Sequence, residues 1–191
     1  MTEAFLVSTG VVALGEIGDK TQLLALLLAA RYRRPLPIVA GILVATLANH
    51  AGAGALGSWI TSALDPRWLR WVLGTSFIAV ALWMLVPDQV DAAEGDRGAA
   101  GRFGIFGITT VAFFLTEMGD KTQIATVMLA ARYDSLAAVV IGTTLGMMIA
   151  NVPAVLLGEQ AVRVLPVRWV HRIAAVVFAA IGVAVLAGVG S

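Results

Sequence analysis

Two nearly identical hexapeptides carry most of the residues in this chain that could bind a cation. Glu-Ile-Gly-Asp-Lys-Thr occupies residues 16–21, and Glu-Met-Gly-Asp-Lys-Thr occupies residues 117–122. Both copies lie within long apolar stretches, and they contain Lys20 and Lys121, the only two lysines of the chain. Charge inside hydrocarbon is costly and usually marks a functional site. The doubled motif therefore predicts a cation site built from two halves of a duplicated membrane protein.

The motif residues can supply an oxygen-lined metal site. In a continuous helix, residues three apart share a face, so we expect each copy to place three oxygen-bearing side chains on one stripe. Carboxylate and amide oxygens suit Ca²⁺, Mg²⁺ and Mn²⁺ better than Cu⁺ or Zn²⁺. Thiolate ligands are excluded because the chain has no cysteine. The predicted metal ligands are Glu16, Asp19, Gln22, Glu117, Asp120 and Gln123.

The charges of the two motifs predict competition between a metal ion and protons. Four carboxylates and two lysines give the fully ionised cluster a formal charge of −2, which one divalent ion neutralises. Without the ion, buried carboxylates repel one another and take up protons instead. Exchange of metal for protons through the same oxygens is the simplest mechanism that follows.

The lysines and glycines of the motif each have a functional and a structural interpretation. Lys20 and Lys121 either hold a carboxylate in place when the metal leaves, or form ion pairs with the glutamate of their own motif four residues earlier. Gly18 and Gly119 permit either a local helix break or close packing of a facing helix. The sequence leaves both alternatives open.

Hydroxyl and amide side chains could complete the site. Thr21 and Thr122 are either ligands or bond their own helix backbone, and Asn49 and Asn151 either face the ion or form interhelical hydrogen bonds. No role is predicted for His50, because the position 101 residues later is an asparagine. The predicted supporting residues are Lys20, Thr21, Lys121, Thr122, Asn49 and Asn151.

Composition predicts an all-α integral membrane protein. The 191 residues are 59% hydrophobic and only 13% charged, about half the charge of an ordinary soluble domain. A spanning helix needs about 20 mostly apolar residues. Six stretches qualify, which are 4–30, 36–62, 68–86, 104–131, 136–162 and 170–189. Within the first, Glu16 lies about 18 Å along the helix from Ala4, which places it near the middle of the bilayer.

The two halves of the chain align with an offset of 101 residues, which indicates a duplication. Each half contains three predicted spans, and because three is odd, the second half must enter the membrane from the opposite side. Inverted repeats of this kind are typical of secondary transporters, with the substrate site near the midplane. We predict a first repeat at residues 1–86, a cytoplasmic linker at 87–103 and an inverted second repeat at 104–191.

The distribution of arginines between the short loops predicts the orientation. One side carries Arg31, Arg33, Arg34, Arg97, Arg102, Arg163, Arg168 and Arg172. The other side carries Arg67, Arg70 and Arg132. The side with more arginines is expected to be cytoplasmic, which places both termini outside.

The doubled motif resembles that of the Gdt-one family of cation transporters, also called uncharacterised protein family sixteen. The similarity extends over essentially the whole chain. It implies a transporter, not an enzyme, that exports Mn²⁺ from the cytoplasm in exchange for protons, with Ca²⁺ as a second candidate and no cofactor beyond the transported ion. The family's motif acids carry over to Glu16, Asp19, Glu117 and Asp120. The chain lacks the additional N-terminal segment of the Golgi members, so we expect a bacterial cytoplasmic membrane.

Other functions remain open at this stage. Asp19 and Asp120 could form the dyad of an intramembrane aspartyl hydrolase, although the adjacent lysines favour ionisation of both. A channel, an exporter of an organic cation and a non-transporting assembly subunit are further alternatives. The net charge of +1 indicates no nucleic-acid partner. The expected partners are a divalent ion, protons and the lipid bilayer, and a homo-oligomer is compatible with the sequence.

Overall fold

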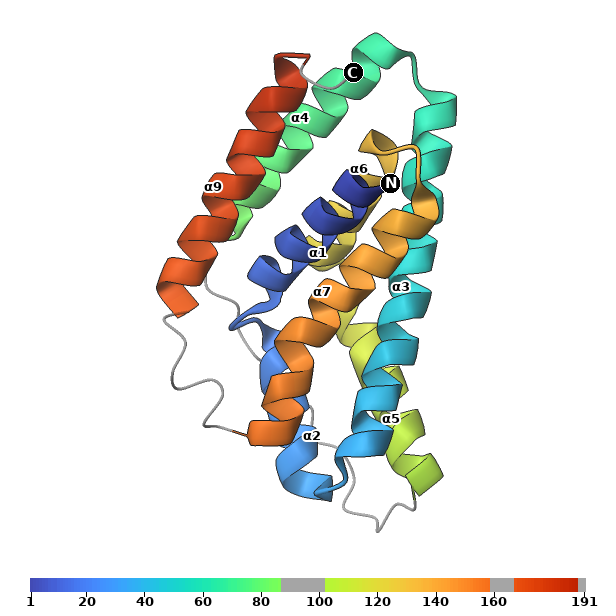
Figure 1. The fold of residues 1–191 in the computed structure, drawn as a ribbon, viewed down its shortest axis with the longest axis vertical. Coiled ribbons are helices and arrows are strands. Elements are labelled where there is room, and N and C mark those ends of the chain that lie inside the picture. Colours follow the sequence, from blue (N-terminus) through green and yellow to red (C-terminus); the bar gives the residue numbers. More distant parts are fainter. Residues whose placement is uncertain (87–101, 159–166, 189–191) are drawn as a thin grey trace.

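The computed structural model describes residues 1–86, 102–158 and 167–188. This part of the chain consists of helices joined by short connections and contains no strand (Figure 1). The all-helical prediction is therefore confirmed. The helices are α1 (Thr2–Glu16), α2 (Lys20–Tyr32), α3 (Pro35–Ala63), α4 (Pro66–Trp83), α5 (Arg102–Glu117), α6 (Lys121–Arg132), α7 (Leu136–Leu157) and α9 (Val167–Leu186).

Four of the six predicted stretches correspond to single helices. The stretches 36–62, 68–86, 136–162 and 170–189 correspond to α3, α4, α7 and α9. The end of the third of these, at 159–162, lies outside the described residues, as does most of the predicted linker at 87–103. The last two linker residues, Arg102 and Phe103, already belong to α5.

The other two stretches are broken at the motif, and the prediction of a continuous helix there is wrong. Gly18 and Gly119 have φ angles of 83° and 80°, in the left-handed region that glycine adopts without strain. A Cβ atom on Gly119 would meet nothing within 4 Å, so backbone conformation rather than close packing explains this glycine. The motif's glutamate therefore ends one helix, and its aspartate precedes the next.

Three described helices are long and apolar enough to cross a membrane: α3, α7 and α9. Helices α5 and α6 pass the same test when they are taken together, although they are bent by 72°. Helix α4 does not pass, because arginines and tryptophans at its start (Arg67, Trp68, Arg70 and Trp71) lower its mean hydropathy. Length and composition alone thus support three or four spans within the described residues, rather than the predicted six.

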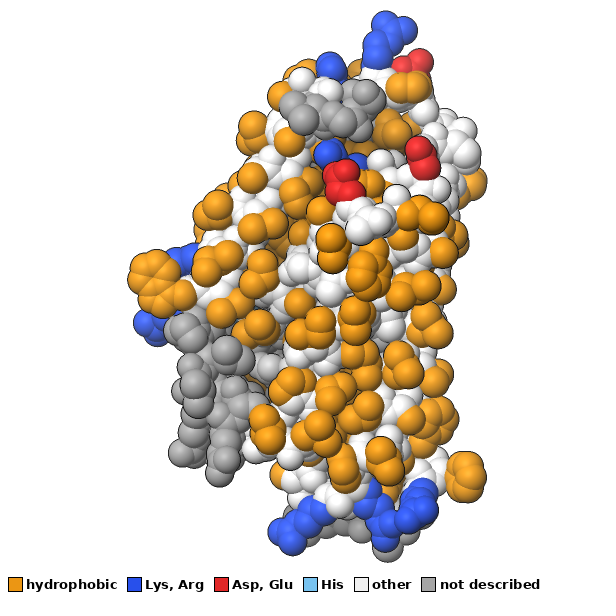
Figure 2. All heavy atoms as spheres, viewed as in Figure 1, with side chains coloured by type: hydrophobic (Ala, Val, Ile, Leu, Met, Phe, Trp, Pro, Cys, Tyr) orange, Lys and Arg blue, Asp and Glu red, His pale blue; other side chains and the backbone are white. Residues whose placement is uncertain are grey.

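The surface of the molecule fits a membrane environment. Hydrophobic side chains cover most of the face in Figure 2, whereas basic side chains (blue) lie mainly at the upper and lower ends, with a further group at the left edge. Many large apolar side chains of the described residues are well exposed, such as Leu115 at 61% and Val176 at 68%. Contiguous exposed apolar surface of this extent marks contact with lipid or with another apolar partner.

The first helix of each half packs against the long helix of the other half. Helix α1 lies on α7, and α5 lies on α3. At the first contact a Cβ atom on Gly142 would lie 2.7 Å from the Phe5 carbonyl oxygen. At the second, a Cβ atom on Gly41 would lie 2.9 Å from the Phe106 carbonyl oxygen. Both pairs are related by the offset of 101 residues, so the duplication is visible in the packing.

The last helices of the two halves, α4 and α9, pack on each other. Phe77 and Phe178, also 101 residues apart, meet there with ring centroids 6.1 Å apart. In Figure 1, α1 begins near the upper end of the molecule and α5 begins near the lower end, so these two helices run in opposite directions. Helix α9 additionally contacts α1, and α4 contacts α6.

Candidate cation site

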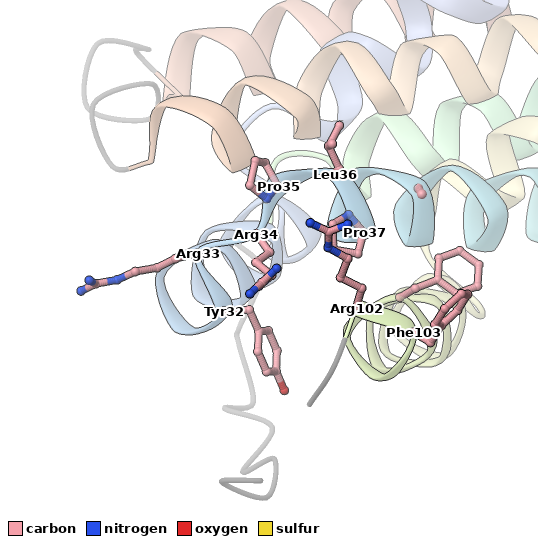
Figure 3. Close-up of a pocket in the computed structure, with 10 residues that line it drawn as sticks. Tyr32, Arg33, Arg34, Pro35, Leu36, Pro37, Arg102 and Phe103 are labelled. Atoms are coloured by element: carbon pink, nitrogen blue, oxygen red, sulfur yellow. The ribbon is translucent and has the colours of Figure 1, made fainter. Parts of the chain in front are cut away.

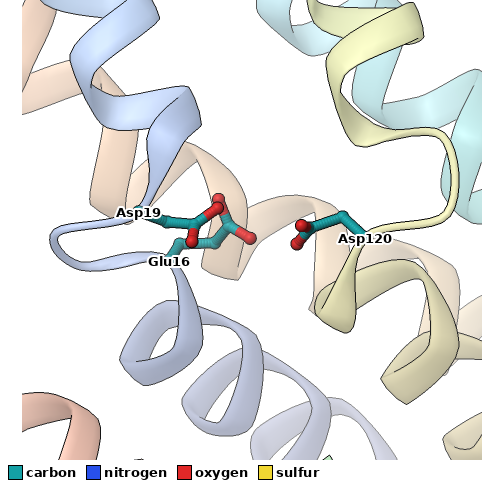
Figure 4. Close-up of side chains that lie close together, drawn as sticks. All are labelled: Glu16, Asp19 and Asp120. Carbon is teal, nitrogen blue, oxygen red and sulfur yellow. The ribbon is translucent and has the colours of Figure 1, made fainter. Parts of the chain in front are cut away.

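The two breaks bring carboxylates from both halves of the chain together. Glu16, Asp19 and Asp120 each offer an oxygen within 4.8 Å of the other two. Figure 4 shows Glu16 and Asp19 side by side at the first break, with Asp120 facing them from the second. The exposed fractions of these three residues are only 0%, 1% and 2%. Glu117 is also fully buried, although it is not one of this closest group.

The glutamines that directly follow the two motifs, Gln22 and Gln123, hold the backbone of the breaks. The Gly18 amide donates to Gln22 Oε1 at 2.9 Å, and the Gly119 amide donates to Gln123 Oε1 at 2.7 Å. The Gln22 side chain also donates to the Ala150 carbonyl at 2.9 Å, which ties the first break to α7. A break leaves backbone amides without helical partners, and these side chains satisfy one in each half. The predicted stripe of three ligands is thus replaced by two acids facing inward and a glutamine that supports the turn.

The threonines orient the glutamates. Thr21 donates to Glu16 Oε2 at 2.7 Å, and Thr122 donates to Glu117 Oε2 at 3.2 Å. Thr122 also lies 3.4 Å from Asp120 Oδ2. Of the two alternatives left open for these hydroxyls, a bond to their own helix backbone is not the one found, because each one bonds the acid at the start of its own motif.

The lysines pair with the aspartate of the opposite repeat. Lys20 Nζ lies 2.8 Å from Asp120 Oδ1, and Lys121 Nζ lies 3.3 Å from Asp19 Oδ1. The structural alternative of ion pairs with the glutamate of the same motif is wrong, because the break ends the helix that would have placed those residues four apart on one face. The lysines instead connect the two halves of the chain across the site.

The crossed pairs leave one oxygen of each glutamate without a partner. Among the described residues, Glu16 Oε1 and Glu117 Oε1 are buried and accept no hydrogen bond. Buried polar atoms are nearly always bonded, and an exception calls for an explanation such as a missing ion or a functional role. These two oxygens are the natural sites for a proton or a cation.

The two asparagines lie on the long helices beside the breaks. Asn49 on α3 donates to the Phe114 carbonyl at 3.0 Å, in the last turn of α5. Asn151 on α7 donates to the Met147 carbonyl at 3.1 Å, whereas its Oδ1 atom is buried without a partner among the described residues. Asn49 therefore makes the interhelical bond that was one of its alternatives, and Asn151 keeps an oxygen free.

A contact from α9 to the first break was not foreseen. The imidazole Nε2 of His171 lies 2.9 Å from the carbonyl oxygen of Ile17, inside the motif. The two residues are 154 positions apart, and no local pattern in the sequence connects them. This contact makes α9 part of the surroundings of the site.

A cavity lies away from the carboxylates and does not suit a cation. It has a volume of about 940 Å³ and lies between the α2–α3 connection and the start of α5. Arg33, Arg34 and Arg102 are among its lining residues, although Figure 3 shows the Arg33 side chain extending away from the cavity. Guanidinium groups repel metal cations, so the breaks are the better candidate for a cation site.

Both halves of the chain match a known family. Residues 4–92 and 105–190 match the family described as "Divalent cation/proton antiporter GDT1". The chain belongs to the GDT1 family. The family resemblance expected from the doubled motif is therefore confirmed. The protein is a membrane transporter of divalent cations and not an enzyme, which removes the hydrolase alternative.

Individual GDT1-family relatives extend over most of the chain. A Vibrio cholerae protein named "Putative manganese exporter" is 50% identical over 90% of this chain and 84% of its own length. A Synechocystis protein named "GDT1-like protein sll0615" is 29% identical over 83% of this chain and 84% of its own. The rice protein "GDT1-like protein 3" is 25% identical over 92% of this chain and 71% of its own. No solved structure matches the chain.

Proposed function

We propose that this protein exports Mn²⁺ from the bacterial cytoplasm in exchange for protons, and that the ion binds between the two breaks. The observation that carries the proposal is the pattern of charge pairing. Each aspartate is paired with a lysine of the other repeat, whereas Glu16 and Glu117 each keep a buried oxygen without a partner among the described residues. The name of the Vibrio cholerae relative supports Mn²⁺ rather than Ca²⁺ as the substrate.

The pairing pattern suggests how metal and protons exchange. The two lysine–aspartate pairs are neutral overall, so the remaining charge falls on Glu16 and Glu117. One divalent ion or two protons neutralise both glutamates, and the two states compete for the same oxygens. Each aspartate can keep its lysine on one oxygen and offer the other to the ion. We expect an electroneutral exchange of two protons for each divalent ion.

The helix ends at the breaks carry partial charges of both signs. Helices α2 and α6 begin there with partial positive charge beside Asp19 and Asp120, whereas α1 and α5 end there with partial negative charge, and these C-terminal ends are the ones that favour a cation. In secondary transporters, broken helices commonly place such ends at the coordinating ion. The separation of 4.8 Å or less between the oxygens of Glu16, Asp19 and Asp120 fits a single metal ion better than an organic cation.

The lysines serve as internal counter-charges during transport. When the ion leaves, Lys20 and Lys121 hold the aspartates of the opposite repeat, so the site does not collapse into unpaired buried charges. The two lysines differ in access, because the exposed fraction of the side chain is 26% for Lys20 and 2% for Lys121. Alternating access requires a site that opens to one side of the membrane at a time. The unequal exposure of the two lysines fits this requirement.

The proposed architecture is a pair of inverted three-span repeats in the bacterial inner membrane. In this arrangement α1 with α2, and α5 with α6, each form one broken span, and α3, α4, α7 and α9 complete six. The opposite directions of α1 and α5 in Figure 1 support the inversion. The distribution of arginines described above supports a position of both termini outside the cytoplasm.

The test is metal uptake by purified protein in liposomes. A trapped dye reports Mn²⁺ entry and a second dye reports internal pH, and the wild type is compared with the double variant Glu16→Gln and Glu117→Gln. The variant keeps the size of both side chains but removes the two charges that bind metal or protons. We expect a loss of Mn²⁺ transport of more than about 100-fold, beyond the usual effect of changing a supporting residue of a metal site.

The matched control is Glu3→Gln. Glu3 is also on α1, but it is exposed and accepts a hydrogen bond from Tyr133. We expect this variant to transport Mn²⁺ and protons like the wild type. Unchanged coupled transport in the double variant would overturn the proposed site, and metal entry without proton movement in the wild type would overturn the exchange.

A further inference from the structure

One buried histidine is not used by the proposed mechanism. His50 on α3 is completely buried, and neither ring nitrogen has a hydrogen-bond partner among the described residues. A buried polar group without a partner destabilises the fold. A side chain in this situation calls for a ligand or a functional reason.

The packing of α3 places His50 at the level of the second break. A Cβ atom on Gly57 would collide with the Val127 carbonyl oxygen, and Thr61 donates to the Ala131 carbonyl at 3.1 Å. The step from Gly57 to Thr61 on α3 thus matches the step from Val127 to Ala131 on α6, so the two helices run in the same direction. His50 lies seven residues before Gly57, and Asp120 lies seven residues before Val127, about two helical turns in each case.

An independent contact supports this placement. Asn49, the neighbour of His50, donates to the carbonyl of Phe114, three residues before Glu117. Residues 49 and 50 are therefore level with both sides of the second break, the end of α5 and the start of α6, although the His50 ring is not a member of the closest group of ligand atoms, which is formed by Glu16, Asp19 and Asp120. The residue that matches His50 in the other repeat is Asn151, whose Oδ1 atom is also buried without a partner among the described residues.

We propose that an imidazole nitrogen of His50 is a ligand of the transported ion and selects Mn²⁺ against Ca²⁺ and Mg²⁺. This inference rests on the proposed function. Carboxylate oxygens accept all three ions, so the motif acids alone give little discrimination. Imidazole is a ligand of transition metals, whereas Ca²⁺ and Mg²⁺ sites are built from oxygens. The neutral ring adds this preference without changing the charge of the site.

The first experiment measures selectivity after His50→Asn. This substitution gives the first repeat the amide that the second repeat carries at residue 151, so a short oxygen donor replaces the nitrogen donor. Liposome uptake is measured for Mn²⁺ with Ca²⁺ as a competitor. We expect the preference for Mn²⁺ over Ca²⁺ to fall about tenfold or more, a usual size for a change at a metal site, while coupled proton movement persists.

The second experiment detects the nitrogen directly in the wild type. Mn²⁺ is added to the purified protein, and pulsed electron paramagnetic resonance measures the coupling of the ion to ¹⁴N nuclei. The chain has only two histidines, and His171 contacts Ile17. We expect a ¹⁴N signal in the wild type and in His171→Gln, and its loss in His50→Asn. The signal does not require that any variant transports.

The outcomes separate this inference from the proposed function. Wild-type Mn²⁺–proton exchange without a histidine ¹⁴N signal, or with unchanged selectivity in His50→Asn, would overturn the role of His50 and leave the exchanger intact. Absence of Mn²⁺ transport by the wild type would overturn the proposed function itself. A ¹⁴N signal that disappears only in His171→Gln would assign the ligand to the other histidine and contradict the inference.

Discussion

The two motif breaks are built alike but are enclosed differently. Gly18 and Gly119 have nearly the same φ angle, and in both breaks a glutamine accepts the glycine amide and a threonine bonds the glutamate. The surroundings differ, because Lys121 is sealed whereas about a quarter of the Lys20 side chain is exposed. The duplicated sequence sets the local geometry of each break, and the rest of the fold sets its access.

The terminal helices add a second difference, which runs the other way. His171 on α9 contacts the Ile17 carbonyl in the first break, whereas Met118, the residue that matches Ile17, is 57% exposed. Helix α4 contacts α6, the second helix of the α5–α6 break. Helix α9 contacts α1, the first helix of the α1–α2 break. Two equivalent breaks thus present unlike faces, and the comparison between them can be tested one residue pair at a time.

The largest predicted difference is between the two lysines. Replacing Lys121 by Met leaves buried Asp19 without its ion pair, and removing one partner of a buried pair costs about 3–5 kcal/mol. Replacing Lys20 by Met also leaves a buried aspartate, Asp120, without its ion pair, but we expect a smaller loss because about a quarter of the Lys20 side chain is exposed and the vacated space opens to the surface. Thermal unfolding in detergent measures both variants. Equal losses would contradict the asymmetry between the two breaks.

The two glycines should behave alike. An alanine at Gly18 or Gly119 would be forced into the left-handed region, which costs roughly 1–2 kcal/mol. Gly10→Ala in α1 and Gly107→Ala in α5 are the controls, because a Cβ atom at either position meets nothing within 4 Å. Within a helix we expect these controls to be neutral or stabilising by about 0.5–1 kcal/mol. Stabilisation by Gly18→Ala or Gly119→Ala would show that the breaks are not formed in the protein.

The glutamines should show a smaller difference. Gln22→Ala loses the bonds to the Gly18 amide and to the Ala150 carbonyl, whereas Gln123→Ala loses the bond to the Gly119 amide. At about 1 kcal/mol for each hydrogen bond, Gln22→Ala should be the more destabilising by roughly that amount. Thermal unfolding in detergent measures both variants. The opposite order would contradict the supporting role of Gln22.

Much of the architecture was predictable from local patterns. Hydrophobic length predicted α3 as 36–62, and the structure has Pro35–Ala63. The offset of 101 residues predicted equivalent halves, and Phe77 with Phe178 meets this expectation in the packing. Such features depend on composition and periodicity, which a single sequence displays directly.

The geometry of the site was less predictable, because it depends on one backbone angle and on contacts between distant residues. The apolar run continues through Gly18, so hydrophobicity predicted an unbroken helix, and the sequence left break and packing as equal alternatives for this glycine. Once the helix ends at Glu16, Lys20 no longer lies beside that residue, and it meets Asp120, 100 positions away. No spacing rule within one motif could predict this pairing.

The most direct test of the central claim counts protons and charge for each Mn²⁺ transported. Purified protein in liposomes takes up Mn²⁺ while one dye reports the metal and another the internal pH, and K⁺ with valinomycin sets the membrane potential. If the lysine–aspartate pairs stay neutral and only Glu16 and Glu117 change charge, two protons leave for each Mn²⁺ that enters, and the rate does not depend on the potential. A rate that follows the potential, or a ratio other than two, would contradict this account of the site.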